Sequence, residues 1–147
     1  MSKNKRLLAG VICVLGAALV VIACGLFRGH FDHGQFEVKE TSRSSAARVA
    51  MVAKRSDHEA MSGDQYFVLL GDHVFSPSEL RSAYYGRHVV FASDGGCLSV
   101  RWSDPHNLTV MCREGSIDPS HIAVQLRQAG DVVISYVNIP DKNSVAR

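Results

Sequence analysis

The chain has 147 residues, and its 16 lysines and arginines against 14 aspartates and glutamates give a formal net charge of +2. This length allows one domain and a targeting segment. Three of the cations, Lys3, Lys5 and Arg6, precede the first apolar segment, so the remainder of the chain is close to neutral. Nucleic-acid binding requires a clustered basic face, and we therefore expect no nucleic-acid partner.

The segment Leu7–Phe27 contains 21 residues without a charge, and Arg28 ends it. A helix needs about 20 apolar residues to cross the hydrocarbon core of a bilayer, so this length favours a retained transmembrane anchor. Cations before such a segment keep the N-terminus in the cytoplasm. We expect residues 1–6 to be cytoplasmic, residues 7–27 to be the anchor, and everything after Phe27 to lie outside the cytoplasm.

A second interpretation of the same segment rests on the sequence Val21-Ile22-Ala23-Cys24, which resembles the bacterial lipobox. In that case Cys24 is lipidated and becomes the first residue of the mature protein, and acyl chains replace the helix as anchor. Ordinary signal cleavage is the third alternative. All three alternatives export the rest of the chain.

The pattern after the anchor predicts one β-rich domain over residues 48–140, made of short apolar runs separated by turn residues. Residues 28–47 are expected to be a tether with at most a short strand at Phe36–Val38, and residues 141–147 a frayed tail. The fold class is α+β, with a small antiparallel-dominated sheet of six or seven strands and one short helix. The expected strands are residues 48–55, 66–71, 87–93, 97–102, 108–113, 122–128 and 132–139.

The one expected helix spans Pro77–Tyr85. Ser76 is a favoured N-cap, proline suits the first helical position, and Glu79 completes a capping box with Ser76. Gly86 is expected to end the helix in a left-handed conformation. The side chains expected to face the sheet are those of Leu80, Ala83 and Tyr84.

Two of the four cysteines, Cys97 and Cys112, flank a turn at Ser103–His106 and are expected on the two arms of a hairpin. If Trp102 opposes Asn107 across this turn, Cys97 lies directly opposite Cys112, within reach of a disulfide. Such a bridge would contribute ~3 kcal/mol in the chain-entropy description. Export to an oxidising space favours the disulfide over the alternative of two buried free thiols.

The histidines offer only weak candidates for chemistry. His30, Asp32 and His33 are close in sequence and could bind a metal, but a hydrated tether explains them as well. Asp72 and His73 follow the most apolar strand, where catalytic groups often lie, and ordinary turn chemistry is the competing explanation. His58 is a further candidate ligand within a polar loop. No nucleophile or phosphate-loop motif is present, and we expect no cofactor.

Aromatic residues supply the candidate interaction surface. Tyr84, Tyr85 and Trp102 could contact a partner because aromatic side chains concentrate at protein interfaces. Partial burial in the core is the alternative explanation for the same residues.

Residues 66–139 resemble small bacterial envelope proteins of unassigned function, which carry an N-terminal apolar anchor and a β-rich domain. Their late hairpin is matched here by Trp102, Asp104, Leu108 and Val110. The resemblance covers about half of the chain. It implies a bacterial inner-membrane protein with a periplasmic domain and carries no catalytic residue. We expect a non-enzymatic interaction or accessory role with another envelope protein. A toxin-neutralising immunity protein and a metal-binding or hydrolytic domain using Asp72 and His73 are the alternatives.

Overall fold

The computed structural model describes residues 16, 19–20, 34–57, 63–86 and 88–145. The chain divides into two units, Met1–His33 and Gly34–Arg147. In the first unit the described residues Gly16, Leu19 and Val20 are helical, and the rest of the expected anchor, Cys24 included, lies outside the described residues. Within the described part of the chain, no helix is long and apolar enough to cross a membrane.

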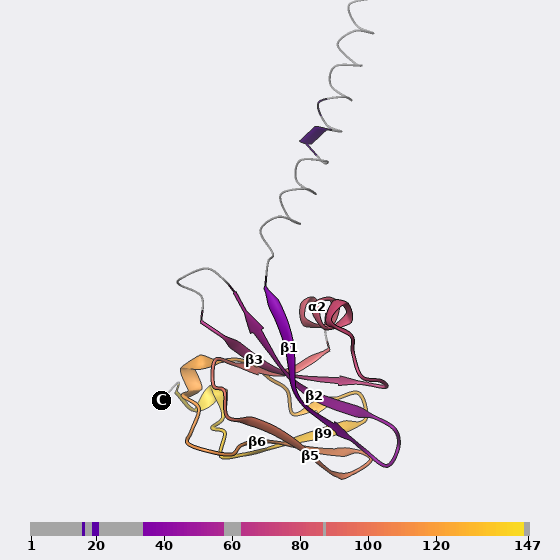
Figure 1. Ribbon diagram of the computed structural model, residues 1–147. Coiled ribbons are helices and arrows are strands. Elements are labelled where there is room, and N and C mark those ends of the chain that lie inside the picture. The colour runs from indigo at the N-terminus through magenta and orange to yellow at the C-terminus, as the bar shows by residue number, and fades with distance from the viewer. Residues whose placement is uncertain (1–15, 17–18, 21–33, 58–62, 87, 146–147) are drawn as a thin grey trace, which may run out of the picture. The chain divides into compact units, whose positions relative to one another are not determined.

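The second unit consists of two β-sheets packed face to face, with helix α2 on the outer face of the larger sheet (Figure 1). The larger sheet has the strand order β1-β2-β3-β4-β7 and the smaller one β5-β6-β9-β8. All pairs are antiparallel except β6 with β9. The elements are β1 (Gln35–Arg43), β2 (Val49–Ser56), β3 (Gln65–Gly71), α2 (Pro77–Tyr85), β4 (Val89–Ser93), β5 (Leu98–Asp104), β6 (Asn107–Cys112), η1 (Pro119–His121), β7 (Ile122–Gln125), β8 (Gln128–Ala129), β9 (Val132–Val137) and η2 (Lys142–Val145).

The expected β-rich, antiparallel-dominated fold with one α-helix is confirmed, but the nine strands form two sheets where one sheet was expected. The chain passes between the sheets at Leu126 and Arg127. The Leu126 N–H still donates to Val90 of β4, whereas the Arg127 carbonyl already accepts from Ile134 of β9. The apolar alternation of residues 122–128 therefore belongs to one bent segment that contributes a strand to each sheet.

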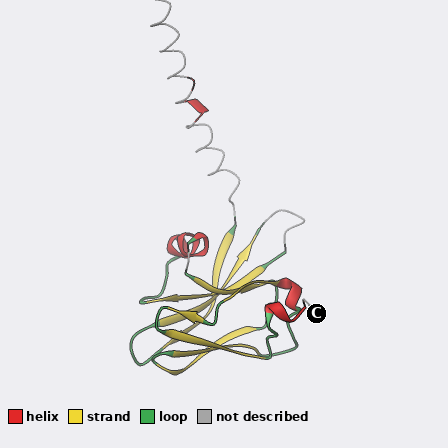
Figure 2. Cartoon of the chain, turned by 180° about the vertical axis from the view of Figure 1, so that it is seen from behind, coloured by secondary structure: helices red, strands yellow, loops and turns green. Residues whose placement is uncertain are grey.

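The larger sheet has a hydrophobic cluster on each face, and Figure 2 shows helix α2 on one side of it and the smaller sheet on the other. In β3, Phe67 and Leu69 pack on the helix side, whereas Val68 points into the core between the sheets. All three side chains are inaccessible to solvent. This double burial explains why residues 66–71 are the most continuously apolar strand of the chain.

Helix α2 has the expected bounds and the expected capping box. The Ser76 N–H donates to Glu79 Oε2 at 2.7 Å, and the Ser76 side chain accepts from the Glu79 N–H. Leu80 and Ala83 are buried against the sheet, and Tyr84 packs beside them. The expected left-handed Gly86 is wrong, because its φ is −81°. A Cβ at this position would lie 3.1 Å from the Ser82 carbonyl oxygen, so close approach explains the glycine.

Strand β1 occupies nine residues of the segment 28–47 in which a tether was expected. It is an edge strand with nine residues, and none of them is fully buried, so its apolar signal in the sequence is weak. A bulge at Lys39 changes the face presented by the second half of the strand. Val38 lies opposite Ala53, and the next paired residue, Glu40, lies opposite Val52 in the core between the sheets.

The carboxylate of Glu40 joins β1 to β5 across the gap between the two sheets. Its Oε1 accepts from Ser99 Oγ at 3.0 Å and from the Val100 N–H at 3.4 Å. Its Oε2 accepts from the Arg113 guanidinium at 3.3 Å. Among the described residues β1 and β5 share no strand pairing. We call the side of the sandwich where these two edge strands meet the β1–β5 seam. The hydrogen bonds of Glu40 join the two strands at this seam in place of backbone pairing.

The C-terminal segment covers the free edge of β7, although residues 141–147 were expected to fray. The Lys142 N–H donates to Gln125 Oε1 at 2.7 Å, and the Lys142 ammonium donates to the Ala123 carbonyl at 2.6 Å. The Gln125 side chain in turn donates to the Pro140 carbonyl at 3.0 Å. These bonds protect the backbone of an edge strand from pairing with another chain.

Replacing the seam carboxylate is expected to destabilise the domain. Glu40→Ala leaves the buried Ser99 hydroxyl and the Val100 N–H without their acceptor, which costs about 1–3 kcal/mol of unfolding free energy. Urea unfolding of the full chain with its disulfide intact measures this loss. Glu37→Ala is the matched control, because Glu37 is exposed on the same strand and forms a surface ion pair with Lys39, and it should leave stability nearly unchanged. Equal effects of the two variants would contradict the role of Glu40.

Candidate functional site

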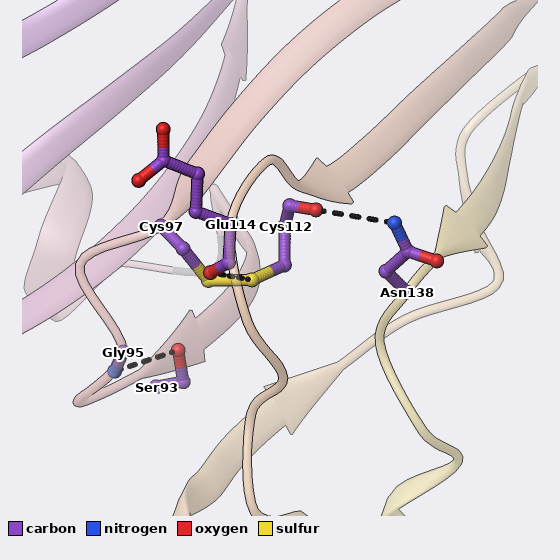
Figure 3. The surroundings of a disulfide bond; sticks show 6 residues. All are labelled: Ser93, Gly95, Cys97, Cys112, Glu114 and Asn138. Atoms are coloured by element: carbon purple, nitrogen blue, oxygen red, sulfur yellow. Dashed lines mark hydrogen bonds between the residues drawn. A yellow bond between two sulfur atoms is a disulfide. The ribbon is translucent and has the colours of Figure 1, made fainter.

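Cys97 and Cys112 form a disulfide, with their Cα atoms 4.8 Å apart (Figure 3). The expected bridge is therefore present, but the expected direct opposition is wrong. Leu98 lies opposite Cys112, and the backbone of Cys97 pairs with Arg113, whose N–H donates to the Cys97 carbonyl at 3.0 Å. The disulfide thus joins residues one register position apart.

The turn of the hairpin explains this shift. Trp102 lies opposite Leu108 rather than Asn107, and Asp104 lies opposite Asn107. Ser103 is the extra residue of a bulge between these two pairs. The turn is two residues shorter than expected and the bulge adds one residue back to the first arm, so every pair on the cysteine side of the bulge moves by one residue.

Cys112 is buried at the end of β6 and held from two sides, as Figure 3 shows. Its Sγ lies 3.1 Å from the Glu114 carbonyl oxygen, a packing contact because a disulfide sulfur carries no hydrogen. The Asn138 side chain donates to the Cys112 carbonyl at 3.4 Å. Asn138 has a φ of 57°, so the chain turns away from β6 at that residue.

Cys97 has a different environment from its partner. It is partly exposed and lines an open depression of 420 Å³, which Cys112 does not line. The charged side chains at the depression are those of Glu40, Arg113 and Glu114. Of the two bridged cysteines, Cys97 is therefore the one that lies beside solvent and charged side chains.

The two tyrosines of helix α2 lie in an aromatic cluster on the helix side of the larger sheet. The ring of Tyr84 lies 5.5 Å from that of Phe36 and 4.9 Å from that of Phe67. The Arg55 guanidinium lies 5.2 Å from the Tyr84 ring and 5.8 Å from the Tyr85 ring, within cation–π range. Tyr84 is partly buried, whereas Tyr85 is 55% exposed, so Tyr85 is the more accessible of the two.

Trp102 belongs to another part of the domain. It packs against the core between the sheets, and its indole N–H donates to the Ser42 carbonyl at 3.2 Å. Tyr84 packs in the helix-side cluster. The structure therefore brings the two tyrosines together and places Trp102 at the β1–β5 seam.

Asp72 and His73 are exposed and form a charge cluster with Glu79. The Nδ1 atom of His73 lies 2.6 Å from Asp72 Oδ1, and its Nε2 atom lies 3.3 Å from Glu79 Oε1. The hydrogen bonds to Asp72 and then Glu79 raise the pKa of His73 above its usual 6.5. A carboxylate at each ring nitrogen favours the imidazolium, which has no lone pair for a proton or a metal.

The candidate metal ligands His30, Asp32 and His33 lie outside the described residues, as does His58. In the ranges that are described, no three or more histidine, cysteine, aspartate or glutamate side chains are placed to hold a metal ion.

Arg48, His106 and Asp131 meet although they lie far apart in sequence, and the sequence analysis did not single them out. The Arg48 guanidinium donates to Asp131 Oδ1 at 2.7 Å, and His106 Nδ1 lies 3.1 Å from Asp131 Oδ2. The Arg48 hydrogen bond lowers the pKa of Asp131 to about 2. Each residue lies at or beside a turn. The parallel pairing of β6 with β9 brings His106 to Asp131, and the packing of the two sheets brings Arg48 to them.

No protein family, no curated protein and no solved structure matches the chain. The resemblance to bacterial envelope proteins therefore stays an expectation, and no residue role is transferred to this chain from another protein.

The charge cluster predicts a raised titration midpoint for His73. Histidine NMR titration of the full chain in detergent should give a midpoint above 6.5, and Asp72→Asn should lower it. Because the folded-state pKa is raised, the contribution to stability is present below pH about 6.5 and is lost as the pH rises through the folded-state pKa. Asp94→Asn, at the carboxylate beside His121, is the control and should not move the His73 midpoint. A midpoint at or below 6.5 in the unmodified chain would contradict the cluster.

Proposed function

We propose that the protein is a membrane-anchored interaction or accessory module of the bacterial envelope, with its β-sandwich domain in the periplasm. Leu7–Phe27 is the anchor, and Lys3, Lys5 and Arg6 keep the N-terminus in the cytoplasm. The described domain begins at Gly34, after this anchor in the chain.

The observation that carries this proposal is the Cys97–Cys112 disulfide. Structural disulfides persist in oxidising compartments such as the periplasm and are rare in the cytosol. The bridge lies on the exported side of the charge-free segment, so two independent features of the chain support the same topology.

A binding role is favoured over a catalytic one by the chemistry of the residues available. His73 has a carboxylate at each ring nitrogen and a raised pKa, so it is poorly suited to act as a general base. Tyr85 is exposed and lies beside Arg55, and tyrosine and arginine are the residue types enriched at the energetic centres of protein interfaces. The Tyr85 face is therefore the proposed contact surface for another envelope protein.

Intact mass of the chain extracted from bacterial membranes tests the anchor and the compartment together. The expected mass is that of the full chain, allowing for loss of Met1, with Cys97 and Cys112 alkylated only after reduction. A mass beginning at Cys24 with added acyl chains would identify a lipoprotein and overturn the retained helix. Alkylation of both cysteines without reduction would overturn the oxidising compartment.

Photo-crosslinking in living bacteria tests the interaction face. Benzoylphenylalanine at Tyr85 is expected to crosslink the chain to a discrete envelope protein. The matched control is Val133, which is 47% exposed on the smaller sheet, away from α2. Crosslinks at Val133 and none at Tyr85 would assign the contact to the other sheet. No discrete crosslink at either position would argue against the interaction role.

A further inference from the structure

The two cysteines of the disulfide differ in exposure, although both contact the core between the sheets. Cys112 is 1% exposed and packs within the core between the sheets. Cys97 is partly exposed, follows the exposed Gly96, and lines the open depression with Leu98. Thiol–disulfide exchange requires a thiolate to reach one sulfur directly, so access decides which sulfur is attacked.

We propose that the Sγ of Cys97 is a thiol-exchange site, at which an external thiol attacks the disulfide from the depression. The ligand class is a thiolate, presented either by a small thiol or by a protein dithiol. This inference rests on the placement of the two cysteines and does not require the proposed interaction role.

The exchange has two balanced steps. The thiolate RS⁻ attacks Cys97 Sγ, the Cys97–Cys112 bond breaks, and a mixed disulfide R–S–S–Cys97 forms. The electron pair of the broken bond leaves on Cys112 Sγ, which takes a proton from water. A second thiolate then attacks the sulfur of R, so that RSSR leaves and Cys97 is released as a thiolate. Overall the protein disulfide is reduced by two electrons and two thiols are oxidised to one disulfide.

The structure also favours reversal of the first step, in which the Cys112 thiolate attacks Cys97 Sγ, expels RS⁻ and restores the Cys97–Cys112 bond. Cys112 is fixed by the Asn138 hydrogen bond to its carbonyl and by burial of its side chain. Its Cα atom lies 4.8 Å from that of Cys97, so the released thiol stays within reach of the mixed disulfide. Cys112 is therefore the resolving thiol, and the exchange is reversible.

The charged groups at the depression influence which thiols react. Arg113 is 66% exposed and pairs with Glu40 at 3.3 Å, while Glu114 lines the same depression. Reversing the Arg113 charge places three anionic side chains at the entry path. An anionic thiol such as glutathione is then repelled, whereas a cationic thiol such as cysteamine is not.

The first experiment locates the adduct in the unmodified full chain. The protein in detergent micelles is incubated with glutathione under native conditions, quenched with acid, alkylated and mapped by peptide mass. The glutathione adduct is expected on Cys97 in at least about tenfold excess over Cys112, and the initial rate is expected to rise linearly with thiol concentration. An adduct mainly on Cys112, equal adducts, or a rate independent of thiol concentration would overturn the proposal, because each requires prior opening of the domain.

The second experiment tests the approach through the depression. Arg113→Glu is expected to slow reduction by glutathione about threefold and not to slow reduction by cysteamine. The matched control is Arg101→Glu, an exposed arginine of β5 outside the depression, which should react as the unmodified chain does. Equal glutathione rates for all three proteins would contradict the proposed path. Repeating the reduction with reduced thioredoxin in place of glutathione distinguishes a small thiol from a protein dithiol as the attacking group. Adduct formation with glutathione identifies a small-thiol site. Exchange with thioredoxin alone identifies a protein-dithiol site.

Discussion

The hydrogen bonds of the Glu40 carboxylate connect the two sheets along the β1–β5 seam, where no backbone hydrogen bonds between described strands join them. On the opposite side the chain itself passes from one sheet to the other at Leu126 and Arg127, and the C-terminal segment covers the free edge of β7. At the β1–β5 side the two sheets meet without strand pairing among the described residues, and Glu40 binds the Val100 N–H of β5. A partly buried carboxylate is suited to this position because both of its oxygens accept hydrogen bonds, whereas a glutamine side chain has one accepting oxygen and one donating nitrogen.

The seam in turn depends on an irregularity of β1. Without the bulge at Lys39, the alternation of the strand would continue from Val38, and Glu40 would lie on the helix side of the sheet with Ala53. The bulge instead places it opposite Val52, in register to reach β5 and Arg113. The depression beside Cys97 contains the same carboxylate, so its shape follows from the closure of the sandwich.

Local signals in the sequence predict local structure well. The Ser76–Glu79 capping box predicts α2 with its observed bounds, because every interaction that starts this helix is made within four residues. Of strand β1 only the short segment Phe36–Val38 is predicted, since an edge strand with no fully buried residue has a polar sequence like that of a tether. The parallel pairing of β6 with β9 and the contact of Arg48 with Asp131 depend on segments far apart in the chain, and a pattern of neighbouring residues carries no information on either.

The strand register of the hairpin determines which residue lies opposite Cys112, and with it the surroundings of Cys97. Directly opposed residues of an antiparallel pair point to the same face of the sheet, and Cys112 points into the core. In the observed register this inward position opposite Cys112 belongs to Leu98, which is buried in the same core. The short turn and the bulge at Ser103 together place Leu98 opposite Cys112 and leave Cys97 one residue earlier, beside Gly96 at the edge of the depression. The same bridge therefore links the hairpin and presents one of its cysteines to solvent, and both consequences follow from the geometry of a turn several residues away.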